Sequence, residues 1–261
     1  MKTYLKCIAN VFWSRSFHVA VHTALLVIIT GLIILANGED RLYDTAVHNI
    51  VRDTMTQEEK VIALNNAAHE LVSSQNKYIA HIRKKGIRSM FFDSGDLQLA
   101  SGGACGSFSH VLGRLLHQAE IPFRIIQMQC HPDSGACHIL VEAKVDEDWV
   151  VLDPLFNLYF PTSTGLATFS EVKQNWGYYK TLTPPNYRMM YDYQHMRRTN
   201  WDKVPFIMTI AKKIVSLFAD PKQISLRSHV LNLYRAYAYA LLFIEALLIF
   251  GTGIWFYQNR L

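Results

Sequence analysis

Three residues of this chain have the types and the order of a nucleophile, a base and an orienting acid. Cys105 lies just after a pair of glycines at a predicted helix start, and His138 and Asp153 lie on two successive predicted strands. A cysteine attacks an acyl carbon only as the thiolate, and the free NH groups and dipole of a helix N-terminus lower its pKa. A histidine can take and return the proton while an aspartate holds the imidazole in the required tautomer. The three residues therefore predict acyl transfer through a Cys-His-Asp triad.

The predicted turn between two strands decides whether His138 and Asp153 can meet. The run 123–152 predicts three antiparallel strands, with the second turn at Asp146–Glu147. If these two residues alone form the turn, His138 falls opposite Leu155 and Asp153 projects from the same face as His138. A three-residue turn without a bulge would send the two side chains to opposite faces. The triad thus depends on the length of this turn.

The helix that begins at Cys105 is predicted by apolar residues that recur at helical spacing between 108 and 116. It ends near Glu120, because Pro122 cannot continue a helix. The backbone NH of Cys105 is the expected donor to an oxyanion, and Gln98, seven residues upstream, is a candidate second donor. The alternative for Gln98 is an ordinary residue of a surface loop.

Two further cysteines, Cys130 and Cys137, bracket a six-residue loop between predicted strands. Cysteines that flank a hairpin loop lie close enough across the strands for a disulfide, which requires an oxidising compartment. Two reduced cysteines that fill space are the alternative. Together with His131 and His138 they could bind zinc, but adjacent ligands on alternating strand faces fit a tetrahedral site poorly. We therefore expect no metal and no other cofactor.

Two apolar runs, 17–36 and 236–257, are long enough to cross about 30 Å of hydrocarbon as helices. Residues 1–16 contain three basic and no acidic residues, and acidic residues follow the first run, so the positive-inside rule places 1–16 in the cytoplasm. The region between the two runs is then extracytoplasmic, in the periplasm. A cleaved signal peptide is the alternative for 17–36, although this run is longer than the usual signal core.

Glu245 lies in the middle of the second apolar run. An ionised carboxylate at that depth is costly, so Glu245 should face a helix, a cavity or a partner. His22 and Thr30 of the first run are the candidate neighbours within the chain. The same position leaves open a membrane-protein partner that binds through the transmembrane helices.

Charge divides the region between the two runs. Residues 37–165 carry 11 Lys and Arg against 16 Asp and Glu, whereas residues 166–235 carry 11 against 4. We expect a domain at 45–165 and a basic extension at 166–235, irregular over 165–201. The extension contains an amphipathic helix at 204–218, expected in the membrane interface, with packing on the core as the alternative. The basic charge predicts contact with membrane lipid, and because no nucleic-acid-binding motif accompanies it, we expect no nucleic-acid partner.

The run GGACGSFSHVLGRLLHQAEIPFRII, followed by His138 and then by DWVVLDP, resembles the transglutaminase-like cysteine peptidase superfamily, of the membrane-anchored bacterial type. Cys105, His138 and Asp153 match the family's nucleophile, base and orienting acid one by one. The resemblance implies an α+β fold with a papain-like core, in which the cysteine at a helix N-terminus packs on an antiparallel sheet. It also implies acyl transfer from an amide or ester and a protein or peptide substrate. Two departures from the family pattern are Glu120 in place of a glycine and Ile139–Leu140 in place of an aromatic residue.

Two functions from different classes follow from these patterns. The first is a membrane-anchored cysteine enzyme that transfers or hydrolyses an acyl group at an amide, as a peptidase or amidase. The second is an inactive transglutaminase-like module that scaffolds a membrane complex, such as one of cell-surface polysaccharide assembly. No Gly-x-Ser-x-Gly elbow or Walker loop occurs in the sequence, which argues against serine hydrolases and P-loop enzymes.

Overall fold

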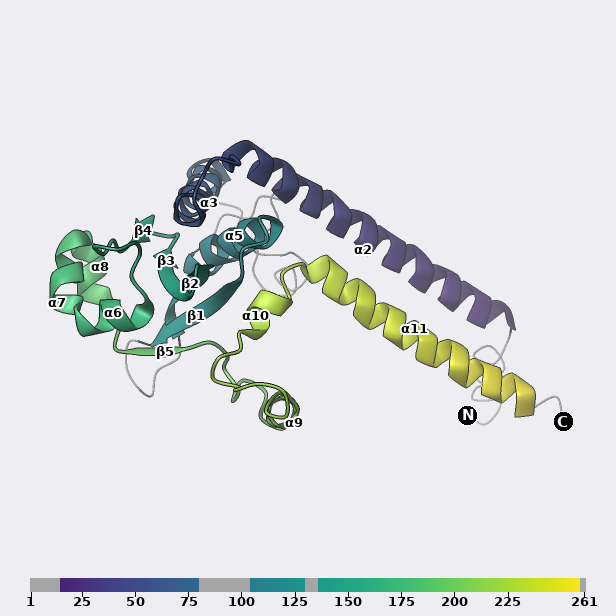
Figure 1. Cartoon of the computed structure of the whole chain (residues 1–261). Coiled ribbons are helices and arrows are strands. Elements are labelled where there is room, and N and C mark those ends of the chain that lie inside the picture. The colour runs from purple at the N-terminus through teal and green to yellow at the C-terminus, as the bar shows by residue number, and fades with distance from the viewer. Residues whose placement is uncertain (1–14, 80–103, 130–135, 259–261) are drawn as a thin grey trace. The chain divides into compact units, whose positions relative to one another are not determined.

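The computed structural model describes residues 15–79, 104–129 and 136–258 (Figure 1). The chain divides into two compact units, Glu39–Leu231 and the pair of terminal segments Met1–Gly38 and Asn232–Leu261. The described helices are α2 (Arg15–Ile50), α3 (Gln57–Ile79), α5 (Cys105–Gln118), α6 (Phe169–Gln174), α7 (Trp176–Tyr179), η1 (Lys180–Leu182), α8 (Pro185–Met190), α9 (Pro205–Val215), α10 (Leu226–His229) and α11 (Leu233–Gln258). The described strands are β1 (Phe123–Gln129), β2 (Ala136–Val145), β3 (Asp148–Asp153), β4 (Leu158–Tyr159) and β5 (His195–Arg197).

An antiparallel sheet with the order β4-β3-β2-β1-β5 forms the centre of the unit Glu39–Leu231. Its β2–β3 turn consists of Asp146 and Glu147 alone, because Val145 pairs directly with Asp148. Asp146 has a φ of 50°, as a tight two-residue hairpin requires. The predicted register is therefore confirmed. Continuing it by one pair sets Asp153 opposite Leu140, two positions from His138 on the same face.

Helices α3 and α5 cover one face of the sheet with an aliphatic core (Figure 1). A capping box starts α3, with Thr56 Oγ1 accepting from Glu59 N at 3.2 Å and Glu59 Oε2 accepting from Thr56 N at 2.8 Å. On α5, Gly113 allows a close approach to the sheet, since a Cβ there would lie 2.8 Å from the Phe123 ring. A side chain at Gly113 would push α5, and with it Cys105, away from β1.

The C-terminal turns of α2 belong to the same unit and fix α5 from its outer side. Arg114 of α5, only 4% exposed, donates to Asp40 Oδ1 at 2.8 Å. Its guanidinium also lies 4.2 Å from the ring centroid of the buried Tyr43. Gln118 donates to Asp44 Oδ1 at 3.2 Å. These contacts join α2 to two successive turns in the C-terminal half of α5, and they limit movement of the helix that carries Cys105.

Residues 165–201 were expected to be irregular, and the structure differs. Helices α6, α7 and α8 pack a second, aromatic core on the other face of the sheet, while β5 pairs with β1 (Figure 1). The same segment belongs to the compact unit Glu39–Leu231. The expectation of irregular structure was wrong. These helices are too short for apolar residues to recur at helical spacing in the sequence.

A buried ionic cluster ties the end of this segment to the sheet. Glu142 of β2 is 2% exposed and accepts two hydrogen bonds from Arg198, at 2.9 and 3.0 Å. Arg124 Nε lies 3.6 Å from the same carboxylate, and the Arg124 guanidinium lies 3.4 Å from the centroid of the Trp149 ring. Three strands or their extensions are thus joined through one carboxylate.

The unit formed by the terminal segments contains two helical stretches. Within the described residues, Ser16–Ile50 and Leu233–Trp255 are long and apolar enough to cross a membrane. His22 Nδ1 lies 2.7 Å from Glu245 Oε1, and the Glu245 side chain is only 5% exposed. His22 is one of the two neighbours that the sequence proposes for Glu245, and it lies within hydrogen-bond distance of the carboxylate. Asn232 also donates to the Ala36 carbonyl at 3.2 Å.

Candidate active site

Cys105 is the first residue of α5, after an extended Ala104 with φ of −94° and ψ of −167°. This position leaves the first NH groups of α5 without partners inside the helix and aims them toward the thiol. Ser109, one turn later, donates to the Ile139 carbonyl at 2.8 Å. Gly106 also lies close to Ile139, whose Cδ1 would be 3.7 Å from a Cβ at that position. The start of α5 is therefore fixed beside the residue that follows His138.

His138 and Asp153 form a buried hydrogen bond on adjacent strands. His138 Nε2 lies 2.6 Å from Asp153 Oδ2, and both side chains are fully buried. The other oxygen, Oδ1, accepts from the NH groups of Leu155 and Phe156 at 3.2 and 3.4 Å. These bonds orient the carboxylate toward the ring, so that Oδ2 accepts a hydrogen bond from Nε2–H of His138. Nδ1 is then the nitrogen that remains for the thiol.

The electrostatics of the site favour a thiolate beside an imidazolium. Burial by itself would raise the pKa of the Cys105 thiol, but the hydrogen-bonding and charge of His138, with the backbone at Ile139 and Gly106, bring it below its ordinary value. Burial would likewise lower the pKa of His138, but Asp153 and Cys105 together raise it to about 9. Nδ1 is buried and is not taken up by a hydrogen bond to any other described residue, which leaves it to act on the thiol.

The structure brings Cys105, His138 and Asp153 together from α5, β2 and β3. Gln98 and Cys130 lie outside the described residues, so the second oxyanion donor stays a prediction. Cys137 is disulfide-bonded, and its pairing with Cys130 also stays a prediction.

Sequence reasoning missed an aromatic wall around His138. Tyr191 stacks on the imidazole, with ring centroids 4.3 Å apart and an angle of 18° between the planes. Phe156 and Tyr187 meet the same ring edge-on, at 5.9 and 6.2 Å. Tyr187 in turn shares a 2.7 Å hydrogen bond with Tyr193. The density of aromatic residues between 176 and 193 is the signal in the sequence that could have indicated this wall.

Helix α3 supports the turn that follows Asp153. His69 Nδ1 lies 2.9 Å from the Pro154 carbonyl, and Asn65 donates to Asn157 Oδ1 at 3.0 Å. Asn157 has a φ of 51°, a left-handed conformation that asparagine adopts more readily than most residues. The two contacts hold the chain from which Asp153 takes its backbone hydrogen bonds.

We expect Tyr191→Leu to slow alkylation of Cys105 at pH 7 by about fivefold, the equivalent of ~1 kcal/mol of cation–π stabilisation of the imidazolium. Tyr191→Phe keeps the ring face and should stay within about twofold of the wild type. The measurement is the alkylation rate as a function of pH, in which Tyr191→Leu should move the thiol ionisation to higher pH. Equal rates for the leucine and phenylalanine variants would show that the stacked ring does not act on the thiol.

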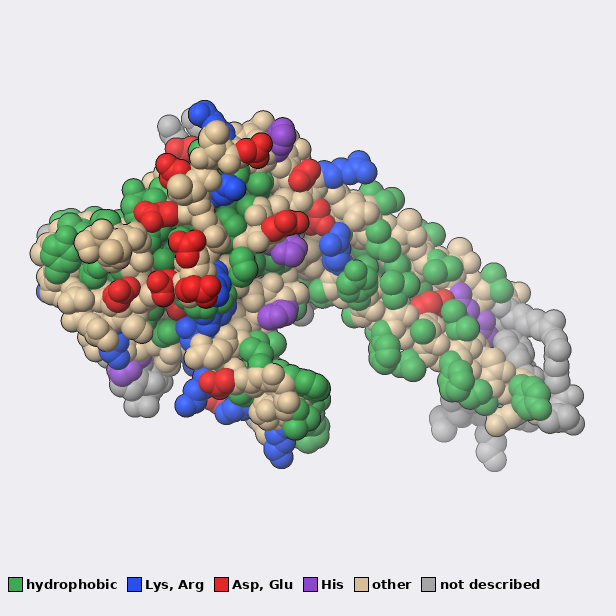
Figure 2. Space-filling view, in the orientation of Figure 1, with side chains coloured by type: hydrophobic (Ala, Val, Ile, Leu, Met, Phe, Trp, Pro, Cys, Tyr) green, Lys and Arg blue, Asp and Glu red, His purple; other side chains and the backbone are tan. Residues whose placement is uncertain are grey.

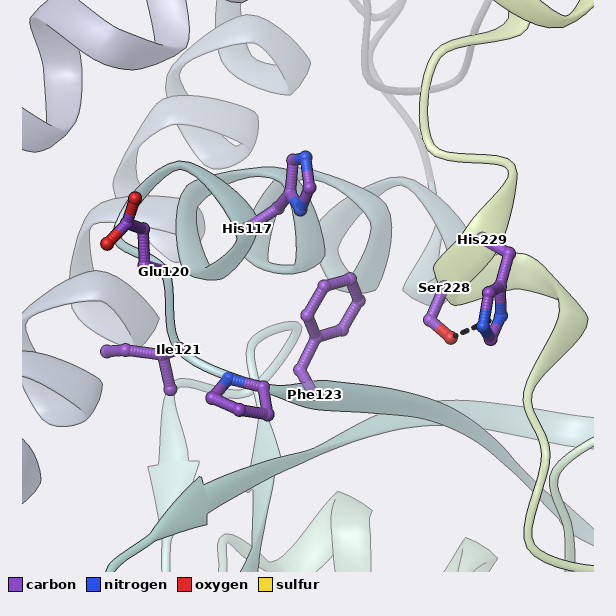
Figure 3. Close-up of a pocket in the computed structure, with 7 residues that line it drawn as sticks. His117, Glu120, Ile121, Phe123, Ser228 and His229 are labelled. Atoms are coloured by element: carbon purple, nitrogen blue, oxygen red, sulfur yellow. Dashed lines mark hydrogen bonds between the residues drawn. The ribbon is translucent and has the colours of Figure 1, made fainter. Parts of the chain in front are cut away.

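A separate pocket of about 380 Å³ lies between the end of α5, the start of β1 and α10 (Figure 3). Its lining side chains include His117, Phe123 and His229. Ser228 Oγ and His229 Nδ1 lie 3.3 Å apart at its rim. None of the three triad side chains lines this pocket, so it is no part of the site built around Cys105.

A family model described as the transglutaminase-like superfamily matches residues 44–154. The matched range begins in the last turns of α2 and ends one residue after Asp153. It includes all three triad positions but none of the tyrosines of the aromatic wall. A comparison with curated proteins found no significant match, and a comparison with solved structures found none either.

Proposed function

Residues 44–154 belong to the transglutaminase-like superfamily, and we propose on that premise that the chain is a membrane-anchored cysteine enzyme. It transfers or hydrolyses an acyl group at an amide, with Cys105 as nucleophile, His138 as base and acid, and Asp153 as the orienting residue. The observation that carries the proposal is the fully buried 2.6 Å bond between His138 and Asp153, combined with a thiol at the first residue of α5. Burying a charge pair of this kind costs desolvation free energy, and titratable groups in such surroundings cluster at functional sites.

The reaction begins from the thiolate of Cys105 and the imidazolium of His138. The thiolate attacks the carbonyl carbon of the amide, and the carbonyl oxygen becomes an oxyanion that the backbone NH of Cys105 can stabilise. His138 then gives its proton to the leaving amine as the C–N bond breaks, which leaves a thioester on Cys105. Water, an amine or a hydroxyl loses a proton to His138 as it attacks the thioester, and the thiolate–imidazolium pair is restored.

The two apolar helices support a location in a membrane, with the domain between them on the extracytoplasmic side. A disulfide at Cys137 suits an oxidising compartment such as the periplasm. A protein or peptide at the membrane surface is the substrate class that this location favours.

The test is whether Cys105 carries a thioester during turnover in native membranes. We expect mass spectrometry of the Cys105 peptide to find an added acyl group that neutral hydroxylamine removes, and the mass of that group identifies the substrate. Cys105→Ala is the matched control. It should lose the adduct, and cells that carry only this variant should show the same phenotype as cells that lack the protein. If Cys105→Ala kept the phenotype while Glu245→Leu abolished it, the scaffold function would replace the enzyme.

A further inference from the structure

Helix α9 and the turn after it expose an unusual amount of apolar surface. The six large apolar side chains with the greatest exposure between 205 and 218 are 45–85% exposed: Phe206, Ile207, Ile210, Ile214, Leu217 and Phe218. They gather on a part of the unit that projects below the sheet, with Lys and Arg beside them (Figures 1 and 2). Contiguous exposed apolar surface of this kind marks an interaction site in a soluble domain.

This surface is held by a rigid base. Thr199 donates to the Ile224 carbonyl at 2.6 Å, and Trp201 Nε1 donates to the Pro221 carbonyl at 3.2 Å, which closes the segment 199–224 into a loop. The adjoining Arg198 is bonded to Glu142 of the sheet. We call the segment 199–224 the arm. The two ends of the arm are thus joined to each other, and through Arg198 to β2, so the apolar side chains are carried on a segment that is tied to the domain at its base.

Helix α9 of the arm has apolar residues on one side and a lysine on the opposite side. At about 100° per residue, Phe206, Ile207 and Ile210 fall in one sector of α9, and Lys212 lies directly opposite the middle of that sector. Lys213 lies at the edge of the apolar sector, where a lysine can extend its ammonium group to lipid phosphates while its stem stays in apolar surroundings. Both lysines are exposed, whereas Ala211 on a third side is half-buried. Apolar residues with lysines at the margin are typical of helices that lie in a membrane interface.

The chain itself supplies the partner for this surface. The apolar helix α11 begins at Leu233, 18 residues after Val215, the last residue of α9. Even a fully extended connection would reach only about 60 Å, so a membrane that holds α11 lies within that distance of the end of α9.

We propose that residues 205–218 of the arm lie in the interface of an anionic phospholipid membrane. The arm thereby fixes the catalytic domain against the lipid surface, independently of the two spanning helices. The inference rests on the membrane anchoring in the proposed function and not on the activity of Cys105.

The test places the photoreactive amino acid p-benzoylphenylalanine at one position of the full-length chain in lipid vesicles. Position 206 samples the apolar sector of α9, position 212 samples its opposite side, and position 243 in α11 reports on the anchor. Phe206 and Phe243 are 78% and 66% exposed, so both replacements avoid the core. All native cysteines remain in place. Lipid adducts are measured by intact mass after irradiation.

We expect lipid adducts at 206 and 243, and several-fold fewer at 212. The yield at 206 should rise in phosphatidylglycerol vesicles over phosphatidylcholine vesicles, whereas the yield at 243 should not change. Lipid adducts at 243 but none at 206 would overturn the inference and leave the anchoring intact. Adducts at 206 to a protein would overturn it in favour of a protein partner. A lack of lipid adducts at 243 would overturn the anchoring, and the inference with it.

Discussion

Alanine in place of His138 is expected to slow the alkylation of Cys105 at pH 7 by about 10- to 100-fold. In the wild type, the thiol pKa lies below its ordinary value because His138 offsets the effect of burial. Without the imidazolium, burial raises that pKa, and only a few per cent of the thiol is ionised at neutral pH. The rate of iodoacetamide labelling at Cys105, followed by mass spectrometry of the full-length chain, measures the change.

The same experiment has a pH signature whose sign follows from the two pKa shifts. Because the Cys105 pKa is lowered and the His138 pKa is about 9, the wild-type rate should be nearly constant between the two values. The rate of His138→Ala should instead climb with pH through a region above the pKa of an ordinary thiol, because burial then raises the Cys105 pKa without an offset from His138. His110→Ala is the matched control. His110 lies on α5, the helix that begins at Cys105, and its Nε2 lies 2.8 Å from the Leu231 carbonyl. If His138→Ala reacted as fast as His110→Ala, His138 would not activate the thiol.

Leucine in place of Glu142 is expected to lower the free energy of unfolding of the domain by about 3–5 kcal/mol. The substitution leaves Arg198 and Arg124 close together without their shared carboxylate, and their side chains are only 11% and 13% exposed. For a domain of this size, the loss corresponds to a fall in Tm of roughly 10 °C. Thermal unfolding in detergent, followed by circular dichroism, measures the effect.

Two variants make the Glu142 result specific. Glu147→Gln removes a 3.4 Å ion pair with Lys144 whose carboxylate is 96% exposed, and it should change stability by less than about 0.5 kcal/mol. Adding Arg198→Met to Glu142→Leu should recover part of the loss, because it removes one of the unpaired guanidinium groups. Equal losses in Glu142→Leu and Glu147→Gln would mean that burial of the cluster has no energetic consequence.

The placement of His138 and Asp153 on one face of the sheet was accessible from the sequence because it depends on local rules. Strand side chains alternate with a period of two, so the length of the Asp146–Glu147 turn alone decided whether His138 and Asp153 share a face. The start of α3 was equally local, since Thr56 and Glu59 lie within one helical turn. Both features depend only on residues close together in the chain.

The aromatic wall could not be predicted from the sequence, because it depends on contacts between residues far apart in the chain. Tyr191 meets His138 across 53 residues, and that contact exists only after α6, α7 and α8 have packed on the sheet. Short helices of aromatic residues carry no clear period, and their tertiary contacts decide their conformation. The change in charge at residue 165 therefore falls inside one compact unit, Glu39–Leu231.

The pairing of β5 with β1 determines how the domain can be divided. Gln127, Met128 and Gln129 take their outer partners from residues 195–197, some 70 positions later in the chain. A protein that ended at residue 165 would leave β1 as an open edge strand, with unpaired NH and carbonyl groups beside exposed apolar side chains. Such an edge recruits other strands, and the fragment would assemble with copies of itself. The superfamily-matched range, 44–154, is thus shorter than the piece of chain that closes this edge of the sheet.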